Sequence, residues 1–199
     1  MTSTLAALLF AHVAADFLLQ SNGMVARKKE PQVLLLHGVI VLATTYAALG
    51  RIDVWEPAAL AAAHVLIDAI KVHALPDRLA SFLGDQAAHL VTLLAVATYA
   101  PDLYAGGFWA DIIWLPAVMT IAAGFLIATV AGGHGVAYLV GQWTKELDQA
   151  ESLPNAGRWI GWLERGIIFV LILANQPAGI GFLIAANRVV RPGRRCHSR

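Results

Sequence analysis

Two pairs of metal-type ligands share one spacing in this sequence. His12 precedes Asp16 by four residues, and His64 precedes Asp68 by four residues. Because four residues advance an α-helix by about 400°, the two members of each pair would lie on one helical face. Imidazole and carboxylate together suit Zn²⁺, Mn²⁺ or Fe²⁺, and the one cysteine, Cys196, lies in a polar tail. The pairs therefore predict divalent-metal chemistry on helices.

Three polar positions, and not only the pairs, repeat along the chain. The second set, His64, Asp68 and His89, follows the first set, His12, Asp16 and His37, by the same 52 residues (64 − 12, 68 − 16 and 89 − 37). The surrounding residues also match, since Ala11–Asp16 resembles Ala63–Asp68. Such repeats indicate a duplicated structural unit. We expect two copies of one helical hairpin, each bringing His, Asp and His to a shared centre.

One carboxylate breaks this symmetry. Asp85 lies four residues before His89, whereas Val33 occupies the equivalent position of the first copy. We interpret Asp85 as a bridging ligand or a general base. The seven predicted ligands are His12, Asp16, His37, His64, Asp68, Asp85 and His89. Two ions about 3.5–4 Å apart, one per repeat, would form a dinuclear centre that activates water and stabilises a leaving oxygen.

Other polar side chains would surround this centre. Gln20, Lys71 and Gln86 lie close to the ligands by helical phase, where they would orient ligands or bind a phosphate. Lys71 has two further interpretations: it reaches to the membrane surface, or it pairs with Asp16 and Asp68 in a polar core without metal. Glu164, Arg165 and Arg188 are candidates for contact with an anionic head group. The alternative interpretation is that they anchor the helix ends at the membrane surface.

The composition places these ligands in a membrane. Apolar residues make up 58% of the 199 residues and charged residues 14%, and the mean hydropathy is +0.65. Soluble domains contain about a quarter charged residues. Ionisable side chains in a membrane cost several kcal/mol unless they are paired or bind a cation, so they mark function by default. The sequence predicts an all-α polytopic membrane protein and no nucleic-acid binding.

Apolar runs predict about seven helices, because a span needs about 20 mainly apolar residues. The five predicted spans are Thr4–Gln20, Val33–Leu49, Pro57–Ala74, Asp85–Tyr99 and Asp111–Val130. A turn signal at Asn175-Gln176-Pro177 separates two shorter helices, Trp159–Ala174 and Ala178–Val190. We expect these two to form a hairpin that does not fully cross the bilayer. The segment Gly132–Gly135 is interpreted as a flexible helix end.

We expect one transmembrane domain over residues 1–199, with the site in a core four-helix bundle. The duplicated hairpins would be residues 1–50 and 51–104. Peripheral helices and a basic tail would occupy residues 105–199.

Basic residues predict the orientation, because Lys and Arg in short loops mark the cytoplasmic side. Arg27, Lys28 and Lys29 lie between the first two spans, and further basic residues lie at Lys145, at Arg158 and in the tail. This indicates an N-terminus outside and a C-terminus inside the cytoplasmic (inner) membrane of a bacterium. The predicted ligands would then lie toward the cytoplasmic leaflet.

These motifs resemble those of a bacterial integral-membrane family that is catalogued only as a domain of unknown function (number thirty-three-oh-seven). The residues that carry the resemblance are Ala11-His12-x3-Asp16-Phe17-x2-Gln20, Leu36-His37-Gly38, His64-x2-Ile67-Asp68-Ala69-Ile70-Lys71, Asp85-Gln86-x2-His89, Glu164-Arg165 and Ile180–Ala186. They span nearly the whole chain. The chain departs from the pattern at Asn187, where the family has Lys. The resemblance implies a site at these polar positions and no particular activity.

The first functional hypothesis is a membrane-embedded, metal-dependent hydrolase with two Zn, Mn or Fe ions, acting on a lipid or lipid-linked substrate. The alternative is a transporter of divalent cations or one linked to protons, since duplicated hairpins with buried ligands are also a transporter plan. Di-iron oxidative chemistry is disfavoured, because bundle di-iron sites use several Glu. A structural metal is a further possibility. The sequence leaves the oligomeric state open.

Overall fold

The computed structural model describes residues 1–144 and 156–190, and in those residues every regular element is helical. They divide into two compact units, Met1–Asp148 and Gln149–Arg199, which we describe separately. Five helices are long and apolar enough to cross a membrane. The predicted all-α, polytopic fold is therefore confirmed.

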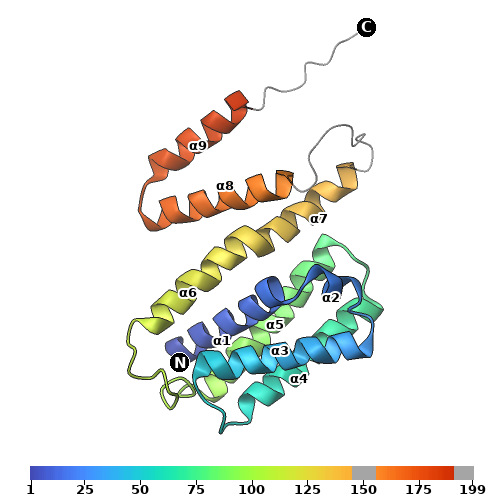
Figure 1. Ribbon diagram of the computed structural model, residues 1–199, viewed down its shortest axis with the longest axis vertical. Helices are drawn as coiled ribbons and strands as arrows, with labels where there is room; N and C mark the ends of the chain where they lie inside the picture. Colours follow the sequence, from blue (N-terminus) through green and yellow to red (C-terminus); the bar gives the residue numbers. More distant parts are fainter. Residues whose placement is uncertain (145–155, 191–199) are drawn as a thin grey trace. The chain divides into compact units, whose positions relative to one another are not determined.

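Four spans form the predicted bundle. They are α1 (Thr2–Ala14) with its π-helical continuation η1 (Ala15–Leu19), α3 (Pro31–Leu49), α4 (Glu56–Ala74) and α5 (Leu79–Tyr99). A short helix, α2 (Asn22–Ala26), lies between η1 and α3. Helix α1 packs against α3 and α5, α3 packs against α4, and α4 packs against α5 (Figure 1). The two hairpins thus close on each other around a common interior.

The ends of these helices follow from local sequence. Helices α3 and α4 have Pro31 and Pro57 in their first turns, where the missing N–H of proline costs nothing. Helix α3 ends at Gly50, whose φ of 66° is left-handed and favours glycine. A Cβ at Gly107 would lie 2.0 Å from the carbonyl oxygen of Leu49, so only glycine permits this close packing of the following loop.

Helix α5 begins earlier than predicted. We predicted a start at Asp85, whereas the helix starts at Leu79. The intervening Gly84 lies within the helix, with no atom within 4 Å of a Cβ built on it. Asp85 therefore lies more than one turn inside α5.

The fifth span is longer than predicted. We predicted Asp111–Val130 with a flexible end at Gly132–Gly135, whereas the apolar helix runs over Leu115–Gly141. It consists of α6 (Leu115–Leu126), a π-helical turn η2 (Ile127–Ala131) and α7 (Gly132–Thr144). Glycine costs a helix only about 1 kcal/mol per residue, and backbone groups in lipid must be satisfied within the segment. The glycines therefore remain helical. Helix α6 packs against α1.

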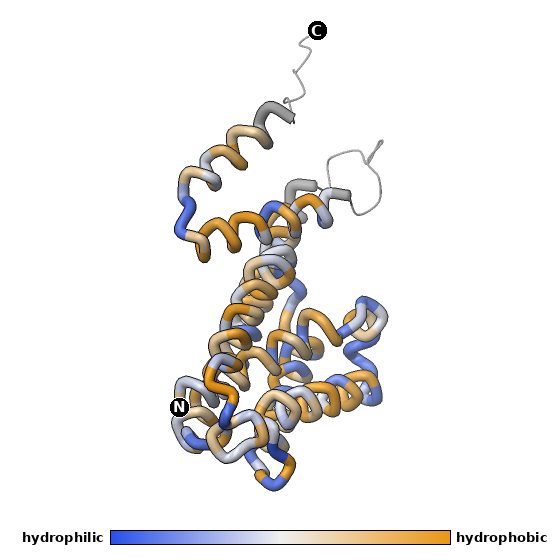
Figure 2. The backbone as a smooth tube through the Cα atoms, turned by 60° about the vertical axis from the view of Figure 1, so that its left-hand side comes forward, coloured by the Kyte–Doolittle hydropathy of each residue, from blue (hydrophilic) through white to orange (hydrophobic). Residues whose placement is uncertain are grey.

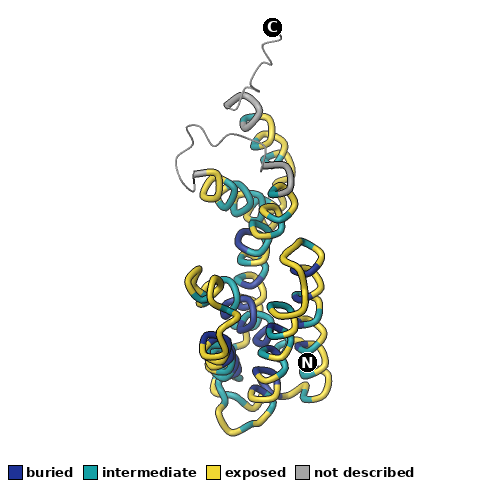
Figure 3. Tube along the Cα trace, turned by 90° about the vertical axis from the view of Figure 1, so that its right-hand side faces the viewer, coloured by how far each residue is buried: buried dark blue, intermediate teal, exposed yellow. Residues whose placement is uncertain are grey.

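Side chains sort by polarity as a membrane requires. The long helices are mostly hydrophobic and the turns that join them mostly hydrophilic (Figure 2). Large apolar residues such as Leu35, Val39 and Leu66 are exposed on the outer faces of the bundle. Buried residues gather on the inner faces (Figure 3), and those of α1 include the small residues Ala7 and Ala11. Small residues allow helices in membranes to approach closely.

A loop closes one end of the bundle. The Thr4 hydroxyl donates to the Pro101 carbonyl (2.6 Å) and accepts from the Tyr104 backbone N–H (3.2 Å). The Trp109 indole N–H donates to the Ala47 carbonyl (2.8 Å). Burial raises the pKa of the Tyr104 hydroxyl, which donates to the Trp109 carbonyl (3.2 Å). These bonds join α1, α3 and the loop after α5.

The second unit contains the predicted helical pair, α8 (Ala156–Leu173) and α9 (Pro177–Val190). The two helices pack against each other, and Asn175 in the turn between them has φ 54°, a left-handed conformation that Asn tolerates. Arg158 lies over the ring of Trp162, 5.5 Å from its centroid. The basic positions predicted at Lys145 and in the tail, Arg191, Arg194, Arg195 and Arg199, lie outside the described residues.

Candidate metal centre

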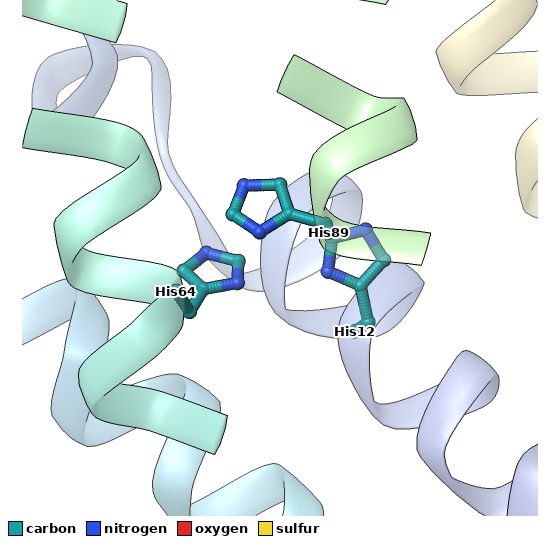
Figure 4. Close-up of side chains that lie close together, drawn as sticks. All are labelled: His12, His64 and His89. Carbon is teal, nitrogen blue, oxygen red and sulfur yellow. The ribbon is translucent and has the colours of Figure 1, made fainter. Parts of the chain in front are cut away.

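All seven predicted ligands meet inside the bundle. They come from four spans: His12 from α1, Asp16 from η1, His37 from α3, His64 and Asp68 from α4, and Asp85 and His89 from α5. The rings of His12, His64 and His89 face one another from three different helices (Figure 4). The other six residues are buried, and the side chain of Asp16 is only 8% exposed. The cluster lies between the middle of the spans and the end that carries α2.

The tightest group of donor atoms contains Asp16, His37 and His64. The two Nε2 atoms of His37 and His64 are 3.0 Å apart. Asp16 Oδ1 lies 3.2 Å from the first and 3.3 Å from the second. On α4, Asp68 Oδ2 lies 3.6 Å from His37 Nε2 and 3.4 Å from His64 Nε2. Two nitrogens are thus flanked by two carboxylate oxygens.

These separations match a coordination polyhedron. A tetrahedral ion with bonds of about 2.0–2.1 Å holds neighbouring ligand atoms about 3.3 Å apart. The nitrogen–nitrogen distance of 3.0 Å and the nitrogen–oxygen distances of 3.2–3.6 Å lie close to that value. The spacing of these donor atoms is therefore compatible with the binding of a divalent cation.

Protons alone satisfy this group poorly. A neutral imidazole carries one N–H, yet His64 Nε2 faces His37 Nε2, Asp16 and Asp68 within 3.4 Å. Among the described residues, Asp16 Oδ1, Asp68 Oδ2 and His37 Nδ1 are buried without a hydrogen bond of good geometry. A buried polar atom without a partner costs about 1–3 kcal/mol. The crowding of acceptors favours a cation over a hydrogen-bonded core.

Two further groups of ligands adjoin the first. His12, His64 and His89 form one, and Asp68, Asp85 and His89 form the other; in each, ligand atoms lie within 4.8 Å of one another. His64 and His89 stack with ring centroids 4.0 Å apart, and His89 Nε2 lies 3.5 Å from Asp85 Oδ1. Both ring nitrogens of His12 and of His89 lack a well-formed hydrogen bond to any described residue.

The ligand groups cross the repeats. The sequence suggested one metal for each copy of His, Asp and His. In the structure, Asp16 and His37 of the first copy are grouped with His64 of the second. This exchange follows from the bundle, since α3 and α4, from different copies, pack side by side.

Two lysines reach the cluster. Lys28 Nζ lies 2.7 Å from Asp68 Oδ1, and Lys71 Nζ lies 3.1 Å from Asp85 Oδ2. One of the interpretations of Lys71, a pairing with Asp16 and Asp68 in a metal-free polar core, is wrong, because Lys71 pairs with Asp85. Lys28 was interpreted only as a marker of orientation; no spacing in the sequence distinguishes it from the neighbouring basic residues.

The remaining predicted residues differ in their placement. Gln86 donates to Asp85 Oδ2 (3.1 Å), and Gln20 Nε2 is buried without a hydrogen bond in the described part of the chain. Glu164 and Arg165 lie on α8, in the second unit, so their proximity to the cluster stays a prediction. Arg188 lies on α9, but its side chain is outside the described residues.

The comparisons with known proteins give a family and no activity. No curated protein and no solved structure matches the chain. One family model, "Protein of unknown function (DUF3307)", matches residues 4–106, a little over half of the 199 residues. The matched stretch contains all seven clustered ligands and both lysines, whereas the motifs on α8 and α9 lie beyond it. The chain therefore belongs to the family of unknown function DUF3307.

Proposed function

We propose that the protein is a membrane-embedded, metal-dependent hydrolase that acts on a lipid or lipid-linked substrate. The observation that carries this proposal is the group formed by Asp16, His37 and His64, whose donor atoms lie within 3.3 Å of one another while Asp16 Oδ1 has no well-formed hydrogen bond to a described residue. Zn²⁺, Mn²⁺ or Fe²⁺ suits these nitrogen and oxygen ligands.

The chemistry combines a metal with a nearby base. A divalent ion supplies Lewis acidity toward water and toward the oxygen of the bond to be cleaved. Asp85 Oδ1 lies 3.5 Å from His89 Nε2 and has no hydrogen bond within the described residues, so it is available to accept a proton from the attacking water. Lys71 and Gln86 hold the other oxygen of Asp85 and so orient the carboxylate.

The position of the cluster supports a substrate that enters from the bilayer. The ligands lie within membrane-spanning helices whose outer faces are apolar, as access from lipid requires. We propose that the centre opens to the cytoplasmic leaflet of a bacterial inner membrane, with the N-terminus outside, because Arg27, Lys28 and Lys29 lie at the same end of the bundle.

A cation carrier is less well supported. Carriers need a polar route from the site to both ends of the bundle. Toward the end closed by the loop after α5, the interior is filled by buried apolar residues, among them Leu8, Leu49 and Leu93. This barrier favours chemistry at one leaflet over transport.

Metal content tests the centre. We expect detergent-purified protein to hold at least about one zinc ion, measured by elemental mass spectrometry. His64→Ala should be nearly metal-free, because His64 belongs to two of the three ligand groups. His73→Ala is the matched control, since His73 lies on the same helix and is exposed. Metal-free wild-type protein would rule out the proposal.

Turnover tests the reaction. The probe is vesicles of phosphatidylethanolamine and phosphatidylglycerol, with products followed by mass spectrometry. Asp85→Asn should retain zinc and lose at least about 100-fold in rate, the smallest effect typical of a general base. Asp102→Asn, at an exposed position of the closing loop, should react as wild type. Zinc-loaded protein that leaves the lipids intact but carries zinc into vesicles would support the carrier instead.

A further inference from the structure

Lys28 is turned into the cluster while its neighbours are not. Its side chain is 11% exposed, whereas the Arg27 side chain is 64% exposed and Lys29 is also exposed. A lysine that served only as an interfacial charge would extend into water. The inward orientation indicates a role at the site.

The two oxygens of Asp68 face different groups. Oδ2 lies 3.4 Å from His64 Nε2, in the tightest group. Oδ1 lies 3.8 Å from His89 Nε2 and 2.7 Å from Lys28 Nζ. The ammonium of Lys28 therefore contacts Asp68 Oδ1, the oxygen that would bind a metal ion in the group of Asp68, Asp85 and His89.

Lysine charge is distributed unevenly between the groups. Asp68 and Asp85 each pair with a lysine, Lys28 and Lys71. Asp16 contacts only histidines among its ion-pair partners in residues 1–144. Lysines thus already neutralise the carboxylates in the group of Asp68, Asp85 and His89. No lysine neutralises the carboxylate in the group of Asp16, His37 and His64.

We propose that Lys28 takes the place of a second metal ion, so that the centre binds one divalent cation tightly, between Asp16, His37 and His64. This inference rests on the metal centre proposed above. Two cations a few ångströms apart repel strongly in a buried site. The Lys28 ammonium therefore excludes a metal ion from the group of Asp68, Asp85 and His89.

This arrangement also indicates the class of substrate. In dinuclear hydrolases the second ion stabilises negative charge on the substrate or leaving oxygen. An ammonium at that position can do the same for a phosphate oxygen. The proposal therefore favours phosphoester lipids over neutral esters and amides.

Zinc binding to the full-length protein in detergent, without substrate, tests the role of Lys28. With zinc alone as the probe, we expect Lys28→Gln to raise tight binding from about one to about two ions per chain. Lys28→Arg keeps the charge and should hold one ion. Lys29→Gln is the matched control, with the same charge change at the exposed neighbouring residue, and should also hold one ion. Size-exclusion chromatography verifies that each variant is folded.

The outcomes separate this inference from the proposed function. Wild-type protein without zinc would refute the metal centre itself. Wild-type protein with two tight ions, or Lys28→Gln with still only one, would refute the role of Lys28 and leave the centre intact. Folded Lys28→Gln protein without zinc would show that Lys28 is needed for zinc binding by Asp16, His37 and His64. That result would also contradict the proposal.

Discussion

Asp16 differs from the other two carboxylates of the cluster in its surroundings. Lysines neutralise Asp68 and Asp85, whereas Asp16 lies 3.2 Å from His37 Nε2 and 3.3 Å from His64 Nε2. Its negative charge is therefore available to a cation. In the metal-free protein this carboxylate is paired only with buried histidines, so a divalent cation between them would bind it more strongly.

Asp16→Asn should weaken both zinc binding and the metal-free fold. Loss of a residue that hydrogen-bonds to a metal ligand typically lowers metal affinity about 10–100-fold. Loss of the ligand Asp16 itself should therefore lower zinc affinity at least about tenfold. The thermal stability of the metal-free protein should also fall, because the buried side chains of His37 and His64 then lose their carboxylate partner. Chelator competition and thermal unfolding in detergent measure the two effects. Asp102→Asn serves as the control, and unchanged zinc affinity in Asp16→Asn would contradict the assigned ligand.

At the scale of elements, the approach of α3 to α4 decides whether the central histidines meet. Gly38 follows His37, and a Cβ on it would lie 2.5 Å from Val65 Cγ2 on α4. Val65 in turn follows His64. The missing side chain at Gly38 therefore lets the two helices bring their Nε2 atoms to 3.0 Å.

Gly38→Ala should push α3 and α4 apart. Overpacking costs about 1–3 kcal/mol, which exceeds the gain of about 1 kcal/mol in helix propensity, so both thermal stability and zinc affinity should fall. Gly84→Ala is the control, because nothing lies within 4 Å of its Cβ, and it should be neutral or stabilising. The double variant Gly38→Ala/Val65→Ala should recover part of the loss, since it removes the clashing methyl group. A Gly38→Ala protein as stable as Gly84→Ala would argue against this contact.

The π-helical turn is a second feature at this scale. Asp16 lies in η1, where the Gln20 backbone N–H donates to the Ala15 carbonyl (3.1 Å), one residue farther than in an α-helix. A wider turn changes the direction in which Asp16 projects, and such turns are frequent at functional sites. Asp16 Oδ2 stays within 3.9 Å of His12 Nδ1, while Asp16 Oδ1 lies beside the Nε2 atoms of His37 and His64.

At the scale of the whole molecule, the two ends of the bundle differ in charge. The end with α2 carries Arg27, Lys29 and Arg78, all exposed. At the other end, the exposed Asp53 side chain binds Arg51 at 2.8 Å, and Asp102 adds a negative charge. The positive end, which is nearer the cluster, should face the cytoplasm.

Cysteine labelling tests this orientation. In a Cys196→Ser background, Lys29→Cys should resist a membrane-impermeant maleimide in intact cells and react after lysis, because basic loops stay inside. Ile52→Cys, at a residue that is 87% exposed at the opposite end, should react in intact cells. The reverse pattern would place the cluster nearer the outer leaflet.

The sequence alone determined the membrane-spanning helices and the residues that line the cluster. Apolar runs of sufficient length identify spans, because lipid demands helices. Four-residue spacing places His12 with Asp16, and His64 with Asp68, on shared faces. Helix ends were less predictable: α5 begins at Leu79 and the fifth span continues through its glycines, because the bilayer stabilises helix where local propensity is weak.

Only the tertiary structure decided which ligands meet. Periodicity reports the face of a helix on which a residue lies, but not the rotation of that helix against its neighbours. Small residues at the contacts between helices, such as Gly38, set that rotation and grouped Asp16 and His37 with His64 across the repeats. The contact of Lys28 with Asp68, 40 positions later, depends in the same way on the folded path of a loop, which no local pattern encodes.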